Sequence, residues 1–273
     1  MTGSDQGVVS SIHIPEDRIL NRPNRTVVHP DMAREGLLLL LDKPSGWTSF
    51  DVVNKVRWVL RKRFGLRKFK VGHAGTLDPM ATGLLLICTG PFTKKLQDLQ
   101  GMDKVYSGTV TLGGITASYD ADSPVEQVQP LDGIDMTAIH KAMEPLIGDI
   151  LQVPPVYSAL KVDGQRAYAM ARKGQSVELA ARPVRIDSFH VSSLEGDQLP
   201  FVVHCGKGTY IRSLAHDLGQ ALGCGGYLSE LRREGIGTFS VQDALTVSEF
   251  EAWANPNPEE KPTAGLENDH ATD

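Results

Sequence analysis

The sequence predicts an α+β protein, and three observations support this fold class. Continuous apolar runs of strand length occur at residues 36–41 and 84–88. Amphipathic patterns with a helical period occur at 48–63, 137–147 and 209–222. Segments of the two kinds alternate irregularly, without the regular βα repeat that is typical of a parallel sheet. This pattern is compatible with helices packed on a mixed sheet, but it does not by itself establish the order of the strands.

The first helix has clear sequence signals at both ends. Thr48 or Ser49 makes a good N-cap, and Val53, Val56 and Leu60 then share one face. Basic residues occupy the other side of this helix and its C-terminal end, where cations complement the helix dipole. We therefore expect an amphipathic helix with a cationic outer face.

The later elements follow from the same kinds of pattern. Residues 209–222 place leucine and isoleucine at helical spacing and end in a glycine-rich segment that is typical of a helix C-cap. β-branched and aromatic residues predict further strands at 105–112, 201–205 and 238–241. Short helices are expected at 93–99, 228–233 and 248–253.

Three regions are expected along the chain. Residues 1–34 mix polar residues with prolines and lack periodicity, which predicts a flexible N-terminal extension. Residues 35–254 form the folded domain. Within it, residues 154–183 carry several Lys and Arg around few apolar residues, and the resemblance of the motif at 153–161 to a known family implies a mobile insertion there. Residues 255–273 hold prolines and acidic residues, which predicts a disordered acidic tail.

The composition is that of an ordinary soluble protein. Of 273 residues, 41% are hydrophobic and 22% are charged, and no apolar run approaches the roughly 18 residues of a membrane span. The N-terminus has no basic flank followed by an apolar core, so no secretory signal is expected. The three cysteines contain no Cys-x-x-Cys pair, which suits a reducing cytoplasm and disfavours structural zinc. We therefore expect a cytoplasmic protein with no membrane segment and no bound metal.

Charge is distributed unevenly along the chain. The net charge of −5 by itself disfavours a nucleic-acid partner. Residues 243–273 hold eight acidic residues and one basic residue, however, and the rest of the chain carries +2. A run of basic residues without any acid between them consists of Lys55, Arg57, Arg61, Lys62, Arg63, Arg67, Lys68 and Lys70. This run suits phosphate contacts that position an RNA, although a solvated helix face would give the same pattern.

One carboxylate, Asp78, lies in a stretch of small residues at 70–83. Its glycines permit positive φ, and Pro79 fixes the turn that follows the aspartate. The apolar run directly after the stretch predicts a buried strand that would anchor the loop. Taken alone, an aspartate in such a loop is most often a turn former or a helix cap.

Five stretches in order resemble the motifs of the TruB family, the tRNA pseudouridine-55 synthases. They are LDKPSGWTS at 41–49, KVGHAGTLDPMATGLL at 70–85, KVY at 104–106, VPPVYSALK at 153–161 and HCGKGTYIRS at 204–213. Together they cover roughly residues 36–244. Only about thirty residues follow Asp243, too few for the PUA-type RNA-binding domain of many members. We therefore expect the synthase domain to bind its RNA alone.

The resemblance implies both a fold and a reaction. The fold is that of the pseudouridine synthases: one α+β domain on a mixed, largely antiparallel central sheet flanked by helices, with an RNA-gripping insertion. The reaction is the isomerisation of uridine 55 to pseudouridine in the T loop of tRNA. It breaks the N1–C1′ bond, turns the base and rejoins it through C5, so it requires no redox step, metal or cofactor. The expected partner is the T arm of tRNA, bound by a monomeric enzyme.

By the same resemblance, three residues carry the chemistry. Asp78 would be the nucleophile, kept ionised by charge-assisted hydrogen bonds from Arg212. Tyr106 would stack on the target base, and a part in the proton transfer is also open to it. The motif does not distinguish attack on the base, attack on the sugar and removal of the C2′ proton. Without the motifs, Arg212 suggests a surface ion pair and Tyr106 a half-buried strand tyrosine.

Three substrate-binding residues are expected around the target nucleotide. A base inside a folded loop must be flipped out, and His73 matches the family histidine that fills the resulting gap. Tyr210 would line the pocket and help to hold Arg212, and Leu231 matches a family position that touches the nucleotide. The simpler alternatives are a solvent-facing loop histidine and a core leucine.

Three further residues complete the predicted substrate site. Asp120 aligns with a family carboxylate near the active site. Lys43 belongs to the first motif, and Lys161 to the insertion that grips the RNA. The loop after Asp120 departs from the family, because Ser123 stands where a glycine is usual.

Two alternatives to this function remain open from the sequence. The protein could mainly unfold and refold tRNA, with catalysis lost or secondary, or it could be a sister synthase that modifies another uridine. A chaperone needs the basic run and His73, whereas only the enzyme needs Asp78, Tyr106 and Arg212 together. Because all three are present, the sequence favours the enzyme.

Overall fold

The computed structural model describes residues 12–24, 30–158, 160–162, 165–167, 170, 177 and 179–254. Within these residues the main sheet has eleven strands, eight of them in the order β1-β2-β4-β13-β5-β12-β11-β8. Their bounds are β1 Ile19–Leu20, β2 Leu38–Lys43, β4 Thr82–Thr89, β5 Lys104–Leu112, β8 Gly148–Gln152, β11 Arg182–Val191, β12 Gln198–Cys205 and β13 Gly226–Ile236. Three short strands pair with these: β3 Val71–His73 with β4, β14 Phe239–Ser240 with β13 and β15 Leu245–Thr246 with β2. Two separate hairpins pair β6 Gly114–Thr116 with β7 Val125–Val128, and β9 Lys161–Val162 with β10 Gln165–Arg166.

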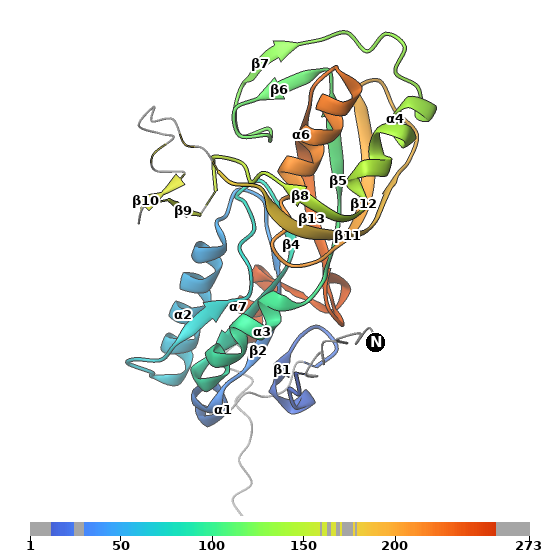
Figure 1. Cartoon of the computed structure of the whole chain (residues 1–273). Helices are drawn as coiled ribbons and strands as arrows, with labels where there is room; N and C mark the ends of the chain where they lie inside the picture. Colours follow the sequence, from blue (N-terminus) through green and yellow to red (C-terminus); the bar gives the residue numbers. More distant parts are fainter. Residues whose placement is uncertain are drawn as a thin grey trace, which may run out of the picture.

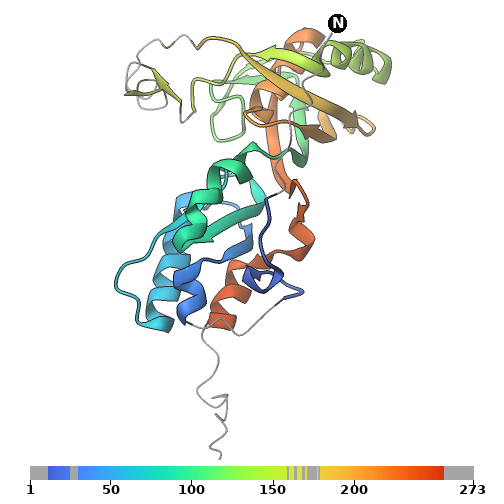
Figure 2. The same cartoon turned by 60° about the horizontal axis from the view of Figure 1, so that its bottom comes forward.

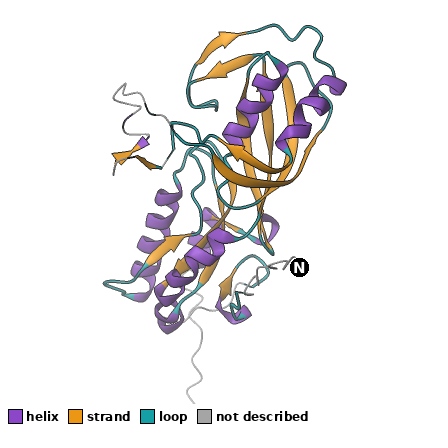
Figure 3. Ribbon diagram, in the orientation of Figure 1, coloured by secondary structure: helices purple, strands orange, loops and turns teal. Residues whose placement is uncertain are grey.

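Helices flank this sheet (Figures 1 and 3). They are α1 Pro30–Glu35, α2 Ser49–Phe64, α3 Leu96–Gly101, α4 Met136–Met143, α6 Ile211–Leu222 and α7 Val247–Ala254. Short 3₁₀ turns occur at η1 Glu16–Arg18, η2 Gly90–Lys95, η3 Glu144–Leu146 and η4 Val241–Asp243. None of the helices in the described part of the chain has the length and apolarity needed to cross a bilayer.

The sheet is mixed and largely antiparallel, which confirms the predicted fold class. Parallel pairing occurs only between β1 and β2, β15 and β2, and β13 and β4 among the described strands. The long pairings of β13 with β5, β5 with β12 and β12 with β11 are antiparallel. Strand β13 therefore lies at the centre, parallel to β4 on one side and antiparallel to β5 on the other.

The sheet carries helices on both of its halves. Helices α4 and α6 cover β5, β12 and β11, whereas α2, α3 and α7 surround β2 and β4 (Figures 1 and 2). One core joins α4 and α6 to the half of the sheet formed by β5, β12 and β11, through residues such as Ile139, Leu214 and Phe201. A second core joins α2 and α7 to β2 and β4, with Val56 and Phe250 fully buried. The site described below lies where the two halves meet.

Helix α2 begins and ends where the sequence predicts. Thr48 is the N-cap, and its side chain accepts a hydrogen bond from the backbone N–H of Asp51. The Asp51 carboxylate in turn accepts from the backbone N–H of Thr48, so the two residues form a reciprocal capping box. Gly65 ends the helix in the left-handed conformation at φ 62°.

The prediction of a short helix at 228–233 is wrong, because these residues lie in strand β13. Leu228 and Leu231 are both buried, and their spacing of three is typical of one helix face. In the strand, the pairing register with β5 shifts between Leu228 and Glu230. A bulge of this kind adds one residue, so two leucines three positions apart come to face the same side of the sheet.

The flexible extension predicted for residues 1–34 is wrong for the part that the structure describes. Strand β1 pairs in parallel with β2, and Leu20 is 1% exposed in the core under α2. The backbone N–H of Arg22 donates to the carbonyl of Asp243 at 2.6 Å. The packing is non-local, so no periodicity within the segment predicts it. Residues 1–11 and 25–29 lie outside the described residues, as does the predicted acidic tail at 255–273.

The predicted insertion at 154–183 lies partly outside the described residues. The structure describes its start at 154–158, the hairpin of β9 and β10, and its end at 179–183, which includes the first residues of β11. The sequence analysis predicts no strand at the positions of β8 and β11. Strand β8 lies at the edge of the sheet and alternates little in polarity, which explains why its pattern gives no strand signal.

Candidate active site

The loop that carries Asp78 is held by a buried lysine on β2. Lys43 has no exposed surface, and its Nζ donates to the carbonyl oxygens of Pro44 at 3.0 Å, Trp47 at 2.6 Å and Pro79 at 3.1 Å. Because an ammonium has three hydrogens, these bonds use all of its donors. The prediction that Lys43 binds the substrate is therefore wrong: the residue holds the turn directly after Asp78.

Helix α2 holds the same loop on its other side. The hydroxyl of Ser49 donates to the carbonyl of Leu77 at 3.2 Å, and the backbone N–H of Leu77 donates back to that hydroxyl at 2.8 Å. The backbone N–H of Gly46 donates to the carbonyl of Pro79 at 2.9 Å. The residues on both sides of Asp78 are thus tied to the N-terminal end of α2.

Asp78 and Arg212 form the ion pair that the sequence predicts. Arg212 Nε lies 3.0 Å from Asp78 Oδ2, and Arg212 Nη2 donates to Asp78 Oδ1 at 3.2 Å. The two contacts make a bidentate pair, which orients the carboxylate as well as attracting it. The Arg212 side chain is 6% exposed and that of Asp78 is 34% exposed, so the carboxylate alone is open to a ligand.

Asp120 lies on the far side of the same guanidinium. Arg212 Nη1 is 3.5 Å from Asp120 Oδ2 and donates to the carbonyl of Ser118 at 3.1 Å. The Asp120 carboxylate also accepts from the hydroxyl of Ser118 and, at 3.1 Å, from the backbone N–H of Asp122. Asp120 is 2% exposed. The structure therefore places this residue as a support for Arg212 rather than on the substrate, which corrects its predicted role.

A stacked pair of rings supports the loop that carries Asp120. Tyr119 has φ 62°, a left-handed backbone conformation that is strained for a residue with a side chain. Its ring stacks on that of His216 from α6, with centroids 3.8 Å apart. His216 lies one helical turn after Arg212, so α6 holds both the arginine and the loop that supports it.

Burial in the site opposes ionisation of Asp78 and Asp122. Burial raises the pKa of Asp78 above its ordinary value, Arg212 opposes this shift, and Asp120 and Asp122 add to it. Burial and the charge of Asp120 also raise the pKa of Asp122. Burial lowers the pKa of Lys43 to about 8, although Asp78 partly offsets this effect. Asp78 is thus a partly desolvated carboxylate held by one buried arginine.

Tyr106 lies next to this pair on β5. It is 8% exposed and belongs to the same apolar cluster as Leu77 and Leu231. Burial raises the pKa of the Tyr106 hydroxyl, and Arg233 partly offsets this through its charge and a hydrogen bond. Tyr106 pairs with Arg233 across β5 and β13, and Leu231 lies two residues earlier on the same strand, paired with Gly108.

Arg233 was not predicted from the sequence, yet it connects three parts of the site. It is 1% exposed, and its Nε donates to the carbonyl of Leu84 at 2.7 Å. Its Nη2 donates to the carbonyl of Gly75, in the loop before Asp78, at 3.2 Å. In the sequence, Arg233 is marked only by its place in the basic pair Arg232-Arg233, two residues after Leu231. Such a pair is equally typical of an exposed surface, so it does not predict a buried arginine.

The neighbouring Arg232 makes a second pair that the sequence reasoning missed. Its Nη1 and Nη2 donate to the two carboxylate oxygens of Asp42 at 3.1 and 2.7 Å. Asp42 also accepts from the backbone N–H of Gly83 at 3.1 Å. The pair joins β13 to β2 and β4 beside the loop that carries Asp78.

The remaining predicted residues lie on separate elements. His73 is on β3, opposite Ile87 of β4, and burial lowers the pKa of its imidazole, which favours the neutral ring. Tyr210 precedes α6, and its backbone N–H and carbonyl both bond to the side-chain amide of Gln152, at 2.8 and 3.1 Å. Lys161 is in β9, and its side chain lies outside the described residues.

The described residues contain no group of three or more His, Cys, Asp or Glu side chains that could hold a metal ion. The three cysteines are free thiols and are buried. The site therefore consists of one partly open carboxylate, its buried arginine, a supporting carboxylate and a buried tyrosine.

Two family models match adjoining parts of the chain, which together span residues 61–266. The N-terminal domain of the TruB family pseudouridylate synthases matches residues 61–211, and the C-terminal domain of tRNA pseudouridylate synthase B matches residues 212–266. The tRNA pseudouridine synthase B of Flavobacterium johnsoniae is 47% identical over 223 residues, which cover 81% of this chain and 97% of the relative. That of Phocaeicola vulgatus is 44% identical over 220 residues, covering 81% and 94%.

Solved structures of larger assemblies share the fold. A crystal structure of a Cbf5-Nop10-Gar1 complex has a TM-score of 0.60 at 30% identity, over 83% of this chain and 58% of that chain. An H/ACA RNP bound to a substrate RNA containing 2′-deoxyuridine has a TM-score of 0.58 at 27% identity, over 92% and 64%. This chain spans less than two thirds of those chains. The match to the N-terminal family model covers more than half of the chain, and the relatives agree with it along almost their whole length. The chain belongs to the TruB family of pseudouridylate synthases.

Proposed function

We propose that this protein isomerises uridine 55 in the T loop of tRNA to pseudouridine. The observation that carries the proposal is the bidentate pair of Asp78 and Arg212 on a partly open carboxylate. The curated relatives named tRNA pseudouridine synthase B support tRNA as the substrate. Residues 35–254 form the catalytic domain, with residues 154–183 as the segment that grips the RNA. The enzyme acts as a monomer in the cytoplasm and binds the T arm.

The reaction is an isomerisation, so its atoms and electrons balance within the nucleoside itself. The N1–C1′ bond breaks, the uracil turns, and a C5–C1′ bond forms. The proton on C5 then leaves, and N1 gains a proton, so nothing is oxidised or reduced. Asp78 is the nucleophile of the first stage, and it must be ionised to act. Arg212 opposes protonation of Asp78 and fixes its two oxygens, while Asp120 holds the guanidinium from its other side through Nη1.

The other residues form the pocket for the flipped base. The target uridine must leave the T loop, which costs a few kcal/mol of stacking. His73 is neutral and lies before the catalytic loop, where a flat polar ring can fill the gap in the RNA. Tyr106 and Leu231 line the apolar side of the pocket, and Tyr210 lines it at the start of α6. Arg233 hydrogen-bonds to Tyr106 and to the backbone carbonyl of Gly75, so it fixes their positions relative to each other.

The Asp78→Asn variant tests this proposal. The amide keeps the shape of the carboxylate but cannot act as the nucleophile, so product formation on unmodified tRNA should be lost while tRNA binding remains within about threefold. Asp98→Asn, at an exposed position on α3, is the matched control and should keep full activity. Continued pseudouridine formation by Asp78→Asn would remove this residue from the chemistry. Tight tRNA binding by wild-type protein without any product would favour an RNA-folding function.

A further inference from the structure

The outer face of α2 carries an exposed tryptophan between two lysines. Trp58 is 54% exposed, although tryptophan is usually well buried in a folded protein. The ammonium groups of Lys55 and Lys62 lie 5.7 and 5.2 Å from the centroid of its ring. Both are within the distance of a cation–π interaction. The ring is thus held on the surface by charged neighbours instead of being packed into the core.

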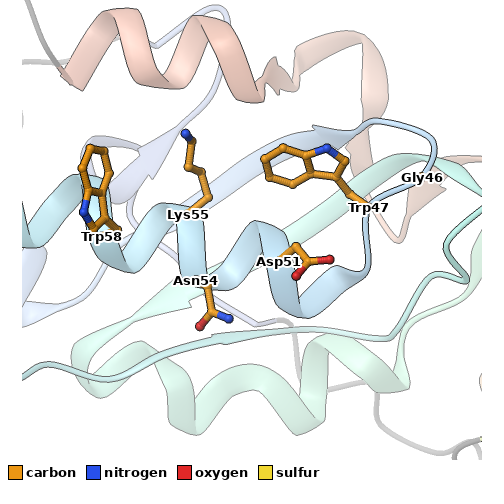
Figure 4. A pocket seen from close by; sticks show the side chains of 6 residues that line it. All are labelled: Gly46, Trp47, Asp51, Asn54, Lys55 and Trp58. Atoms are coloured by element: carbon orange, nitrogen blue, oxygen red, sulfur yellow. The ribbon is translucent and has the colours of Figure 1, made fainter.

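A surface groove runs along this face. Figure 4 shows Trp47, Lys55 and Trp58 spaced along α2 from the turn at Gly46. A second hollow continues past Trp58 to Arg67, so the tryptophan lines both. Gly46, at the near end, bonds to the carbonyl of Pro79 in the catalytic loop. Trp58 lies ten residues after the N-cap, or about 15 Å along the helix axis from the end of α2 that is tied to the Asp78 loop.

The charges around Trp58 indicate what kind of molecule this surface binds. Six cations in the described part of the chain lie next to the second hollow or just beyond it and make no ion pair: Arg57, Arg61, Lys62, Arg67, Lys68 and Lys70. Arg57 and Arg61 hydrogen-bond to carbonyl oxygens of Val71 and Leu66, and Lys62 and Arg67 lie beside Trp58 in the second hollow. One carboxylate, Asp51, lines the groove nearer Gly46, and it caps the helix. Lys55, which also lines the groove, pairs with Glu251 at 2.6 Å. An exposed ring among free cations is the pattern of a surface that binds a nucleic acid, since a base stacks on the ring and phosphates pair with the cations.

We propose that Trp58, Lys62 and Arg67 form a second RNA contact, which binds tRNA outside the flipped T-loop nucleotide. Trp58 stacks on an exposed base or ribose, and the two cations pair with neighbouring phosphates. The contact raises tRNA affinity without touching the reacting atoms. This inference rests on the proposed function for the identity of the RNA, but it concerns binding and can be tested separately from catalysis.

Binding and steady-state kinetics on full-length unmodified tRNA test the proposal. Trp58→Ala should raise the Kd and the KM about fivefold to tenfold, with kcat at saturating tRNA within twofold of wild type. Trp58→Phe should keep most of the affinity, because phenylalanine also offers an aromatic face. Lys62→Ala together with Arg67→Ala should lower the slope of log Kd against log salt by about 1 to 2. Lys141→Ala, exposed on α4, is the control for loss of a surface charge and should change neither constant.

The outcomes separate this inference from the proposed function. Unchanged Kd and KM in Trp58→Ala would overturn the inference and leave a protein partner as the occupant of the groove, even if wild-type enzyme makes pseudouridine. Weaker tRNA binding by Trp58→Ala would support the contact, even if the wild-type protein made no product. Equal losses in Trp58→Ala and Trp58→Phe would contradict stacking as its basis.

Discussion

At the scale of single residues, the site depends on one arginine between two carboxylates. Arg212 is buried, and a buried cation is stable only when it is paired and hydrogen-bonded. Asp120 and the carbonyl of Ser118 take one side of its guanidinium, which leaves the Nε and Nη2 donors for Asp78. Because Asp120 is buried and Asp78 is partly open, only Asp78 can meet a substrate. The same arginine therefore fixes the reactive carboxylate and is itself held in place.

Arg212→Gln should reduce both activity and stability. Loss of the guanidinium leaves two carboxylates facing each other, so kcat should fall at least about 100-fold, the effect typical of losing a preorganised donor. Breaking a fully buried ion pair costs about 3 to 5 kcal/mol, and the loss of unfolding free energy should be smaller here because Asp78 is partly exposed. Urea unfolding and single-turnover kinetics measure the two effects. Arg185→Gln, in an exposed pair with Asp103, should cost less than about 1 kcal/mol. Full activity in Arg212→Gln would contradict the role of the pair.

The raised pKa of Asp78 predicts a pH dependence of the reaction. In the proposed mechanism the ionised carboxylate is the active form, and burial raises its pKa above the ordinary value of 3.8. A raised pKa means that Asp78 gains its proton at a higher pH than an ordinary aspartate, so kcat/KM should fall on acidification before an exposed carboxyl titrates. Asp217, whose pKa burial raises to about 6, lies five residues after Arg212, so Asp217→Asn is the control. An acid limb at or below 3.8, or one abolished by Asp217→Asn, would contradict the assignment to Asp78.

At the scale of elements, the Asp78 loop is positioned by three separate segments. Lys43 of β2 and Ser49 of α2 bond to the backbone beside Asp78, and Arg233 of β13 bonds to the backbone of Gly75. The loop leads directly into β4, which pairs with β2 and β13. Its geometry therefore depends on the close approach of β4 to β13.

Gly83→Ala should disrupt this approach. Gly83 has φ 103°, and a Cβ there would lie 2.4 Å from the carbonyl oxygen of Arg233, which is backbone and cannot move aside. The backbone conformation alone costs about 1 to 3 kcal/mol for a residue with a side chain, and the clash adds to it. Gly133→Ala, at φ 78° with open space around it, isolates the conformational part. Urea unfolding of both variants measures the difference. Equal losses would show that contact between β4 and β13 does not limit the fold.

Some elements and site residues could be predicted from the sequence alone, and others could not. Local signals located α2, because its caps and its apolar face lie within the helix, and the motif located Asp78, Arg212 and Tyr106. The sequence could not locate β13, because its bulge imitates helical spacing. It also missed Arg233, whose role depends on contacts with Leu84 and Gly75 about 150 residues earlier. Lys43 was assigned to the substrate for the same reason: only the fold shows that backbone carbonyls use its donors.

At the scale of the whole molecule, one sheet joins two helical layers, and the residues of the Asp78 site come from both. Asp78 and Lys43 belong to the half built on β2 and β4, and Arg212 and Asp120 to the half built on β5 and β12. Because β13 pairs with β4 and β5, it holds the two halves together at the site. The pair of Asp78 and Arg212 therefore depends on the pairing of β13 with both β4 and β5.

Position-resolved mapping of pseudouridine on unmodified tRNA tests the central claim most directly. The purified protein is incubated with the tRNA without any added cofactor, and Asp78→Asn is treated in parallel. The account predicts a signal at uridine 55 with wild-type protein and none with Asp78→Asn. No product, or product at a different uridine, would contradict it.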